Sequence, residues 1–410
     1  MTKGAFALIV VGLAVYLVAN QTQVGWLYLF DAVLWSLLVL SVVLPGYNLK
    51  YLRVEQQILL PASHLHELPL GGPLEDETIE IKLKVSNSGR LARYFIKLVA
   101  DCPFEKPEAR RKDFLLNIVR PSSPTVFSFT GTCDRRGYYS SSSVTLQSSG
   151  PLGLIVRRRS FQLPLNLTVY PAYYRIGELP AAGEEWAEWG YGAKSSSASE
   201  FYGSRNYQYG DPLKHVHWRN TARIGHFMIK EFEQAQQGSV TVAFDTSRDF
   251  GAGRETTLEY SIKIAASLAK LCADFGRSVD IIAGEMALHN ADWQTAMDYL
   301  ARLEVTGKNV PAELPPVSEA NQAIVAIISA VVGGQTSELA QLASRGRGVV
   351  VLLEGFSPDE VSEKVVSELR GRNLEIISCS CGNLEEVLDK LGGSLFFAGR
   401  FAGRGSNYAG

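Results

Sequence analysis

Charged residues are almost absent from the start of the sequence. Residues 4–49 contain a single one, Asp31, although charged residues make up 20% of the whole chain. This scarcity excludes a water-exposed surface for the segment and predicts two membrane-spanning helices, at about residues 4–19 and 25–44, in a hairpin formed by residues 1–50. For the first run a cleaved signal peptide is the alternative, because Lys3 precedes it and residues 17–19 resemble a cleavage site.

Lysine and arginine are missing from the loop between the two runs. Lys3 flanks the first run, and Lys50 and Arg53 flank the second. Because positive charge concentrates on the cytoplasmic side, we expect both termini and the soluble domains in the cytoplasm, with the hairpin in the inner (plasma) membrane. Cysteine is also scarce, and five residues, an odd number, make a poor disulfide framework.

Several functional classes are excluded by what the chain lacks. Its 40 basic and 42 acidic residues leave a net charge of −2, which argues against a nucleic-acid-binding protein with a strongly basic surface. No Gly-x-x-x-x-Gly-Lys-Ser/Thr loop is present, so the usual phosphate cradle of P-loop ATPases is missing. No Gly-x-Ser-x-Gly nucleophile elbow follows a predicted strand either.

Residues 54–171 carry the pattern of a strand-rich domain. Polar and apolar residues alternate in residues 78–85, the period of a half-buried strand, and residues 86–90 follow as a turn. Further short strands are predicted at residues 94–99, 125–130, 138–146 and 165–170. This spacing predicts an antiparallel β-sandwich of immunoglobulin-like type.

A Gly-, Ala-, Ser- and Glu-rich linker at residues 172–199 leads into a dense polar segment. Arginines in this segment can form an internal ion-pair lattice or a surface for an acidic partner, and the sequence leaves both open. His215 and His217 would share one face of a strand, so a metal-dependent hydrolase that uses them with Asp211 and Asp245 is an alternative.

Strands and helices alternate in the remainder of the region 200–398. Apolar strands are predicted near residues 240–244, 279–283, 323–332, 349–353 and 374–378, with helices between most of them. This order predicts an α/β domain with a mainly parallel sheet. The Gly-rich tail at residues 399–410 is expected to be disordered.

The polar segment resembles the signature of the domain of unknown function 58 family, MoxR-associated proteins with a von Willebrand factor A-like domain. Residues 149–154 and 169–171 are similar to the family's upstream pattern. The resemblance implies a multidomain protein in which the α/β domain is von Willebrand A-like and the partner is a MoxR-type AAA+ ATPase. The residues that carry it, and that we expect to support the fold or a partner interface, are Arg205, Tyr207, Gly210, Asp211, His217, Trp218, Arg219, Arg223, Lys230 and Glu231.

The same resemblance implies a metal site after the first strand of the α/β domain. Von Willebrand A domains hold a divalent cation with an Asp-x-Ser-x-Ser loop, and this chain has Asp245 and Ser247 with Asp249 at the fifth position. Glu354 stands where a second acid is common, and the usual threonine is not identified. Oxygen ligands suit Mg²⁺ or Mn²⁺, and a capped strand–helix turn without metal is the alternative.

These observations favour a non-enzymatic adaptor. Two helices anchor the chain in the membrane, and the α/β domain binds an ATPase in the assembly or maturation of other proteins or in envelope stress. Nucleic acid is not expected as a partner. The alternatives are the metal-dependent hydrolase and a metal-free structural scaffold.

Overall fold

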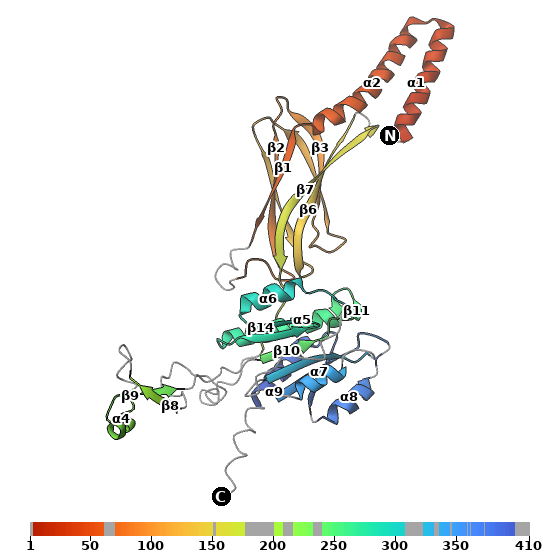
Figure 1. The fold of residues 1–410 in the computed structure, drawn as a ribbon. Coiled ribbons are helices and arrows are strands. Elements are labelled where there is room, and N and C mark those ends of the chain that lie inside the picture. The colour runs from red at the N-terminus through yellow and green to blue at the C-terminus, as the bar shows by residue number, and fades with distance from the viewer. Residues whose placement is uncertain are drawn as a thin grey trace. The chain divides into compact units, whose positions relative to one another are not determined.

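The protein is described here from a computed structural model. It describes residues 3–60, 70–150, 153–176, 201–207, 216–232, 240–307, 323–331, 336–344, 347–358, 360, 362–372 and 374–397. The chain divides into two compact units (Figure 1): Met1–Ala172 with Asp298–Leu303, and Tyr173–Met297 with Glu304–Gly410. The predicted disordered tail and most of the predicted linker lie outside the described residues.

Two apolar helices open the first unit. α1 (Lys3–Thr22) and α2 (Gly25–Leu49) are both long and apolar enough to cross a membrane. Their surfaces expose large apolar side chains such as Leu29, which is 72% exposed. Asp31 is 7% exposed, and its Oδ1 has no hydrogen-bond partner among the described residues. The two predicted helices are therefore present, and both extend beyond the predicted ends.

α2 continues past the proline that ends the apolar run. Pro45 lies inside the helix, which ends only at Leu49. A proline removes the hydrogen bond to the carbonyl four residues earlier, here that of Ser41. The helix therefore continues five residues past the predicted end of the span at about residue 44, and Tyr47, Asn48 and Leu49 in this extension contact the strands that follow.

Two antiparallel sheets follow, and we call them together the two-sheet body. The first has the order β1-β2-β5 and the second the order β4-β3-β6-β7. Both sheets contribute to one buried core, in which Ile81 and Leu83 of the first join Leu98 and Leu146 of the second. Alternation of buried and exposed residues in β2 confirms the predicted strand there. The strands are β1 (Leu52–Leu59), β2 (Thr78–Asn87), β3 (Arg93–Asp101), β4 (Arg111–Val119), β5 (Thr125–Thr132), β6 (Gly137–Ser149) and β7 (Val156–Val169).

The end of α2 is fixed directly to the two-sheet body. The guanidinium of Arg93, a residue only 1% exposed, lies 3.9 Å from the centre of the Tyr47 ring. Asn48 donates its side-chain amide to the carbonyl of Tyr94 at 3.3 Å, and Arg159 donates to the carbonyl of Leu49 at 3.1 Å. Within the described residues, Nε and Nη1 of Arg93 have no hydrogen-bond partner. The Tyr47 ring is therefore the main compensation for a buried positive charge.

The second unit is built on a six-stranded sheet with the order β14-β13-β10-β15-β16-β17 (Figure 1). Five strands are parallel and the edge strand β14 is antiparallel, so the predicted mainly parallel sheet is confirmed. All five residues of β10 are buried, as a strand covered on both faces requires. The elements are β10 (Val240–Phe244), α5 (Thr257–Asp274), β13 (Val279–Ala283), β14 (Met286–Ala291), α6 (Trp293–Arg302), β15 (Ala323–Ser329), α7 (Thr336–Ala343), β16 (Arg347–Glu354), α8 (Ser362–Arg370), β17 (Glu375–Ser380) and α9 (Leu384–Phe397).

A small module precedes this sheet in the chain. β8 (Phe201–Asn206) pairs antiparallel with β9 (Met228–Phe232), and α4 (Trp218–Ile224) lies between them in sequence. Two-residue strands β11 (Gly251–Ala252) and β12 (Glu255–Thr256) form a hairpin before α5.

Tyr47→Leu is expected to destabilise the first unit more than Arg93→Met does. Loss of the ring leaves the buried guanidinium without its main partner, at a cost of about 2 kcal/mol, whereas Arg93→Met removes the charge itself. The measurement is the thermal unfolding midpoint of the detergent-solubilised protein. The double variant should lie close to Arg93→Met, and a Tyr47→Leu protein as stable as wild type would contradict the assignment.

Candidate functional site

The carboxyl ends of the parallel strands meet at one edge of the six-stranded sheet. Phe244 at the end of β10 is level with Ile327 of β15, so Asp245 follows level with Ile328, one residue before Ser329 at the end of β15. A cavity of about 20 Å³ lies there, which is large enough for one water molecule or one ion of similar size. Its polar lining residues are Asp245, Arg248, Thr257, Ser261 and Ser329.

Asp245 and Ser247 form a compact pair. The carboxylate of Asp245 accepts one hydrogen bond from the Ser247 amide and one from the Ser247 hydroxyl, each 2.8 Å long. Neighbouring oxygen ligands of a six-coordinate Mg²⁺ lie about 2.8–3.0 Å apart, given metal–oxygen distances of about 2.0–2.1 Å. The spacing of the Asp245 and Ser247 oxygens is therefore compatible with two adjacent ligands of one cation.

Asp249 is engaged with the start of α5. Its Oδ1 accepts from the Leu258 amide at 3.0 Å and from the Thr257 hydroxyl at 3.2 Å. Thr256 caps the same helix by accepting from the Glu259 amide at 3.3 Å. Because the first amides of a helix have no partner within it, Asp249 satisfies a backbone donor, the Leu258 amide, that the helix itself leaves unpaired.

Glu354 does not lie on a strand next to that of Asp245, as a shared metal site would favour. β15 separates β10 from β16, so two strand spacings, or about 9–10 Å, lie between the backbones. In the part of the chain that the structure describes, no group of three or more His, Cys, Asp or Glu residues is arranged to hold a metal ion. The structure thus brings Asp245 and Ser247 together and gives Asp249 and Glu354 other positions.

Glu360 is a residue of this edge that the sequence did not indicate. Its carboxylate accepts the backbone amides of Gly355 and Phe356 at 2.7 Å and that of Ser357 at 3.0 Å. The loop after β16 is therefore wrapped around an internal carboxylate. Ser329 was also missed, although a polar residue after six buried apolar ones in β15 was a usable signal.

Cys381 is the exposed cysteine of this edge. Its Sγ lies 4.0 Å from the carbonyl oxygen of Gly355. Partial burial raises the pKa of the Cys381 thiol, and the carboxylates of Glu255 and Glu360 raise this pKa further. The other four cysteines are buried, and burial raises the pKa of each to about 12.

Thiol labelling of the native protein is expected to show one reactive cysteine. Only the thiolate reacts, so the raised pKa of Cys381 should make labelling slow at pH 7 and about tenfold faster per pH unit up to pH 8.5. The measurement is the rate of reaction with a chromogenic disulfide, with Cys381→Ser as control. Two or more thiols reacting at this rate in the native state would contradict the burial of the other four.

The β8–α4–β9 module is held together by backbone and side-chain caps. Nδ1 of His217 accepts from the Asn220 amide at 3.0 Å and so caps α4, while the Thr221 hydroxyl accepts from the Met228 amide at 3.0 Å. This cap uses Nδ1 of His217 and leaves the hydrolase alternative a prediction, since a metal can be bound through either imidazole nitrogen. Asp211, His215 and Gly210 lie outside the described residues.

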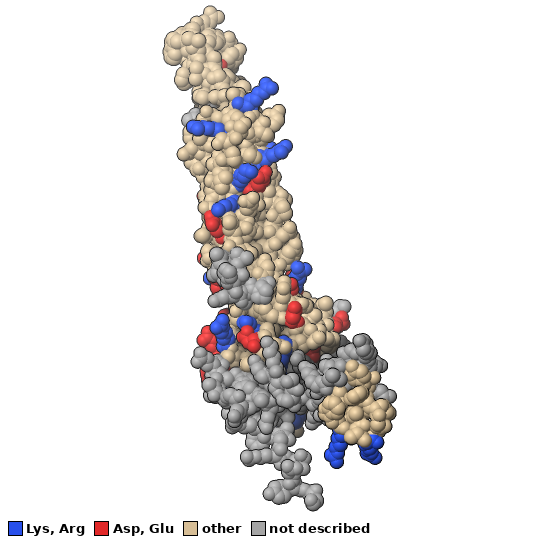
Figure 2. Space-filling view, turned by 90° about the vertical axis from the view of Figure 1, so that its left-hand side faces the viewer, with Lys and Arg blue, Asp and Glu red and all other residues tan. Residues whose placement is uncertain are grey.

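One surface of this module combines aromatic rings with arginines, and we call it the aromatic–arginine surface. Trp218 is 64% exposed and Phe227 is 50% exposed, with their ring centres 6.3 Å apart. Arg219 and Arg223, four residues apart on α4, are exposed too, and neither has an ion pair with any described carboxylate. On the face that Figure 2 shows, the described part of the module carries basic side chains.

The other signature residues are placed in part. Tyr207 donates its amide to the carbonyl of Phe227 at 2.9 Å, and its ring lies 6.0 Å from that of Phe227. The backbones of Arg205, Lys230 and Glu231 lie on the paired strands, with Ser204 opposite Lys230. Their side chains lie outside the described set, so the predicted ion-pair lattice stays a prediction.

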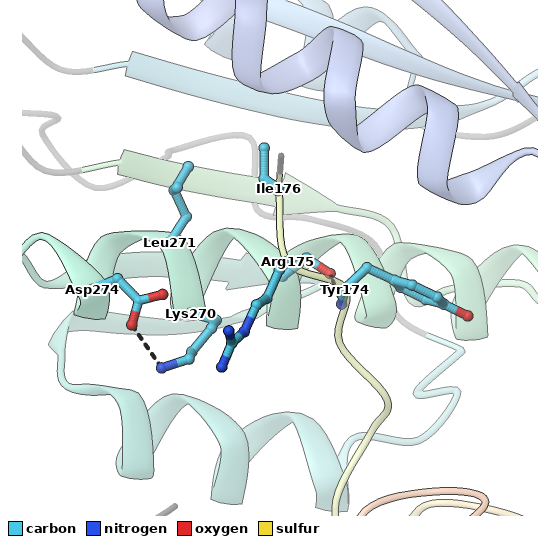
Figure 3. Close-up of a pocket in the computed structure, with 7 residues that line it drawn as sticks. Tyr174, Arg175, Ile176, Lys270, Leu271 and Asp274 are labelled. Atoms are coloured by element: carbon cyan, nitrogen blue, oxygen red, sulfur yellow. Dashed lines mark hydrogen bonds and ion pairs between the residues drawn. The ribbon is translucent and has the colours of Figure 1, made fainter. Parts of the chain in front are cut away.

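A larger cavity, of about 320 Å³, lies between α5 and residues 174–176 (Figure 3). Lys270 forms an ion pair with Asp274 at 2.6 Å, and the Tyr174 amide donates to the Ser267 hydroxyl at 3.0 Å. The side chain of Arg175 extends towards the same side as that of Lys270 (Figure 3). Nothing in the sequence indicated this cavity, because its two walls are almost a hundred residues apart.

Comparisons with known proteins give one family and one relative. The family model described as "Protein of unknown function DUF58" matches residues 203–292, which run from β8 through β14. The uncharacterized protein YeaD of Bacillus subtilis (strain 168) is 27% identical over 279 residues, 62% of this chain and 66% of YeaD. The chain therefore spans slightly less than two thirds of that relative's length.

Solved structures show only weak similarity. The sporulation control protein Spo0M from Bacillus subtilis is 14% identical with a TM-score of 0.15, over 27% of this chain and 48% of that one. A GH20 exo β-N-acetylglucosaminidase from Vibrio harveyi is 9% identical with a TM-score of 0.18, over 80% and 57% of the two chains. Scores this low assign no fold.

Proposed function

We propose that this protein is a membrane-anchored, non-enzymatic adaptor that works with a MoxR-type AAA+ ATPase. The process it serves is the assembly or maturation of other proteins, or envelope stress. The observation that carries the proposal is the aromatic–arginine surface of Trp218, Arg219, Arg223 and Phe227, within the segment that matches the DUF58 family model.

The chemistry of this surface favours a protein partner. Tryptophan and arginine are the residues most enriched at binding hot spots, because they bury much area and form two-point hydrogen bonds. Two exposed rings that lie side by side, Trp218 on α4 and Phe227 after it, form an apolar patch of the kind that marks a binding surface. Two arginines that form no ion pair with any described carboxylate favour an acidic patch on that partner.

The architecture supports the same proposal. We infer that α1 and α2 span the plasma membrane with both ends in the cytoplasm, since Lys50 and Arg53 follow α2 directly. The two sheets with one shared core fit an immunoglobulin-like sandwich, and the mainly parallel sheet fits a von Willebrand A-like domain. In this arrangement the partner-binding domain stays on the side of the membrane where ATP is available.

A cation at the edge of the six-stranded sheet is part of the proposal. Asp245 and Ser247 would hold Mg²⁺ or Mn²⁺, and Ser329 lines the same cavity. When bound, such an ion would accept a carboxylate of the partner at an open coordination position. Asp249 and Glu354 would not be needed as direct ligands, since Asp249 caps α5.

Loss of the aromatic–arginine surface is expected to weaken ATPase capture. The triple variant Trp218→Ala, Arg219→Gln, Arg223→Gln should recover at least tenfold less MoxR-type ATPase from a detergent-solubilised lysate, because the loss of even one hot-spot residue costs about 2 kcal/mol, or about thirtyfold in affinity. The readout is quantitative mass spectrometry of the captured protein. Arg370→Gln with Arg372→Gln, which removes two basic residues of α8 and its following turn, is the matched control.

Two results would contradict the adaptor proposal: no ATPase captured by the wild-type protein, or equal recovery of the ATPase by the wild type and the triple variant.

Metal binding is expected to depend on Asp245 and not on Asp249. In isothermal titration calorimetry of the full chain in detergent, Mg²⁺ or Mn²⁺ should bind wild type and fail to bind Asp245→Asn. Asp249→Asn should keep the binding but lower the unfolding temperature, since a lost helix cap costs about 1 kcal/mol. No heat of binding to the wild-type protein would instead favour a metal-free scaffold.

A further inference from the structure

Four connections of the two-sheet body come together at the end where α2 enters. Leu52 lies opposite Asn87, Arg93 opposite Val119 and Ser149 opposite Val156 in the strand pairings. The start of β1, the β2–β3 turn, the β4–β5 connection and the β6–β7 hairpin therefore share this end. Its exposed basic residues, which we call the basic collar, are Lys50, Arg53, Arg90, Arg120, Arg157 and Arg158.

Acidic residues are missing from the same end. Residues 45–53, 86–95, 117–126 and 147–159 contain no Asp or Glu. Among the described residues, no member of the basic collar has a carboxylate within ion-pair distance. The opposite end of the body, by contrast, carries Glu75, Asp76, Glu77, Asp101 and Glu105. Figure 2 shows basic side chains just below the helical hairpin.

Exposed apolar and aromatic side chains accompany the collar. Phe95 is 68% exposed, Leu91 60%, Tyr51 51% and Tyr94 50%. Tyrosine and arginine together are typical of the boundary between hydrocarbon and headgroups, because each has an apolar body and a polar tip.

Contacts with α2 show how far along the helix axis the arginines and the apolar residues of this end lie. A β-carbon built on Gly46 would lie 3.7 Å from the Arg157 side chain, and Gly150 in the β6–β7 hairpin lies directly against the backbone of Ser41. Ser41 is about 7.5 Å farther along the helix axis than Gly46, at about 1.5 Å per residue. The described residues of the hairpin tip, 150 and 153–156, include no charged residue, so apolar residues lie deeper along α2 and the arginines lie shallower.

We propose that this end of the two-sheet body binds anionic phospholipid headgroups through the basic collar. The inference rests on the proposed membrane span of α2, which places the collar at headgroup depth. Phosphate oxygens are the groups that exposed guanidinium forks without carboxylate partners bind best. The exposed Val156 of the hairpin and the four exposed side chains Tyr51, Leu91, Tyr94 and Phe95 enter the interface beside them.

The test uses the full chain reconstituted in vesicles that contain spin-labelled lipids. Electron paramagnetic resonance gives the association constant of phosphatidylglycerol relative to phosphatidylcholine at the protein surface. We expect a ratio well above one for wild type, falling severalfold for Arg157→Gln with Arg158→Gln, since each charge near a membrane contributes about a fivefold preference at low salt. Lys106→Gln with Arg111→Gln, exposed residues at the opposite end, should leave the ratio unchanged.

Two further arms separate the possible outcomes. Inorganic phosphate should not displace phosphatidylglycerol from the protein surface. If phosphate abolishes the preference for phosphatidylglycerol over phosphatidylcholine at matched ionic strength, the collar binds a soluble anion and the proposal is overturned. A wild-type ratio of one, or equal ratios in both double variants, also overturns it. If alkaline carbonate extracts the chain from the vesicles, both the membrane span of α2 and the lipid-binding proposal that rests on it are overturned.

Discussion

The buried guanidinium of Arg93 against the Tyr47 ring is the contact on which the first unit depends. It lies where an apolar helix meets a two-sheet body, and a charge in such a place needs compensation. Asn48 and Arg159 add hydrogen bonds at the same junction, so the helix ends in contacts rather than in a linker. This junction holds the end of α2 against the strand ends that carry the basic collar.

Parts of the fold were predictable because they follow from local periodicity. The alternation in residues 78–85 fixes which face of β2 is buried, and five consecutive buried residues mark β10 as a central strand. β1 and β4 were missed, since Gln56 takes a half-buried position in β1, and Leu115 and Ile118 take exposed positions in β4. The continuation of α2 through Pro45 could not be predicted either, because it depends on contacts with strands far along the chain.

The candidate site was predictable to a smaller extent, for the same reason. Asp245 and Ser247 are neighbours in sequence, and their hydrogen bonds need only a local turn. Whether the Asp249 carboxylate faces an ion or the first turn of a helix depends on where α5 begins. The distance between Asp245 and Glu354 depends on the order of the strands in the sheet. Strand order is a property of the whole sheet, and a linear motif does not contain it. The helix cap by His217 is a further case in which a residue with metal-binding chemistry serves the backbone.

The close approach of Gly150 to Ser41 has a mechanical consequence. A β-carbon at residue 150 would lie 2.6 Å from the Cα of Ser41, so only glycine allows the β6–β7 hairpin to touch the helix backbone. We therefore expect α2 and the β6–β7 hairpin to move together as one rigid body. In a bilayer the tilt of a long apolar helix depends on the thickness of the hydrocarbon layer. If α2 spans the membrane as proposed, the two-sheet body would lean with it, and membrane thickness would set the angle at which the body leaves the surface.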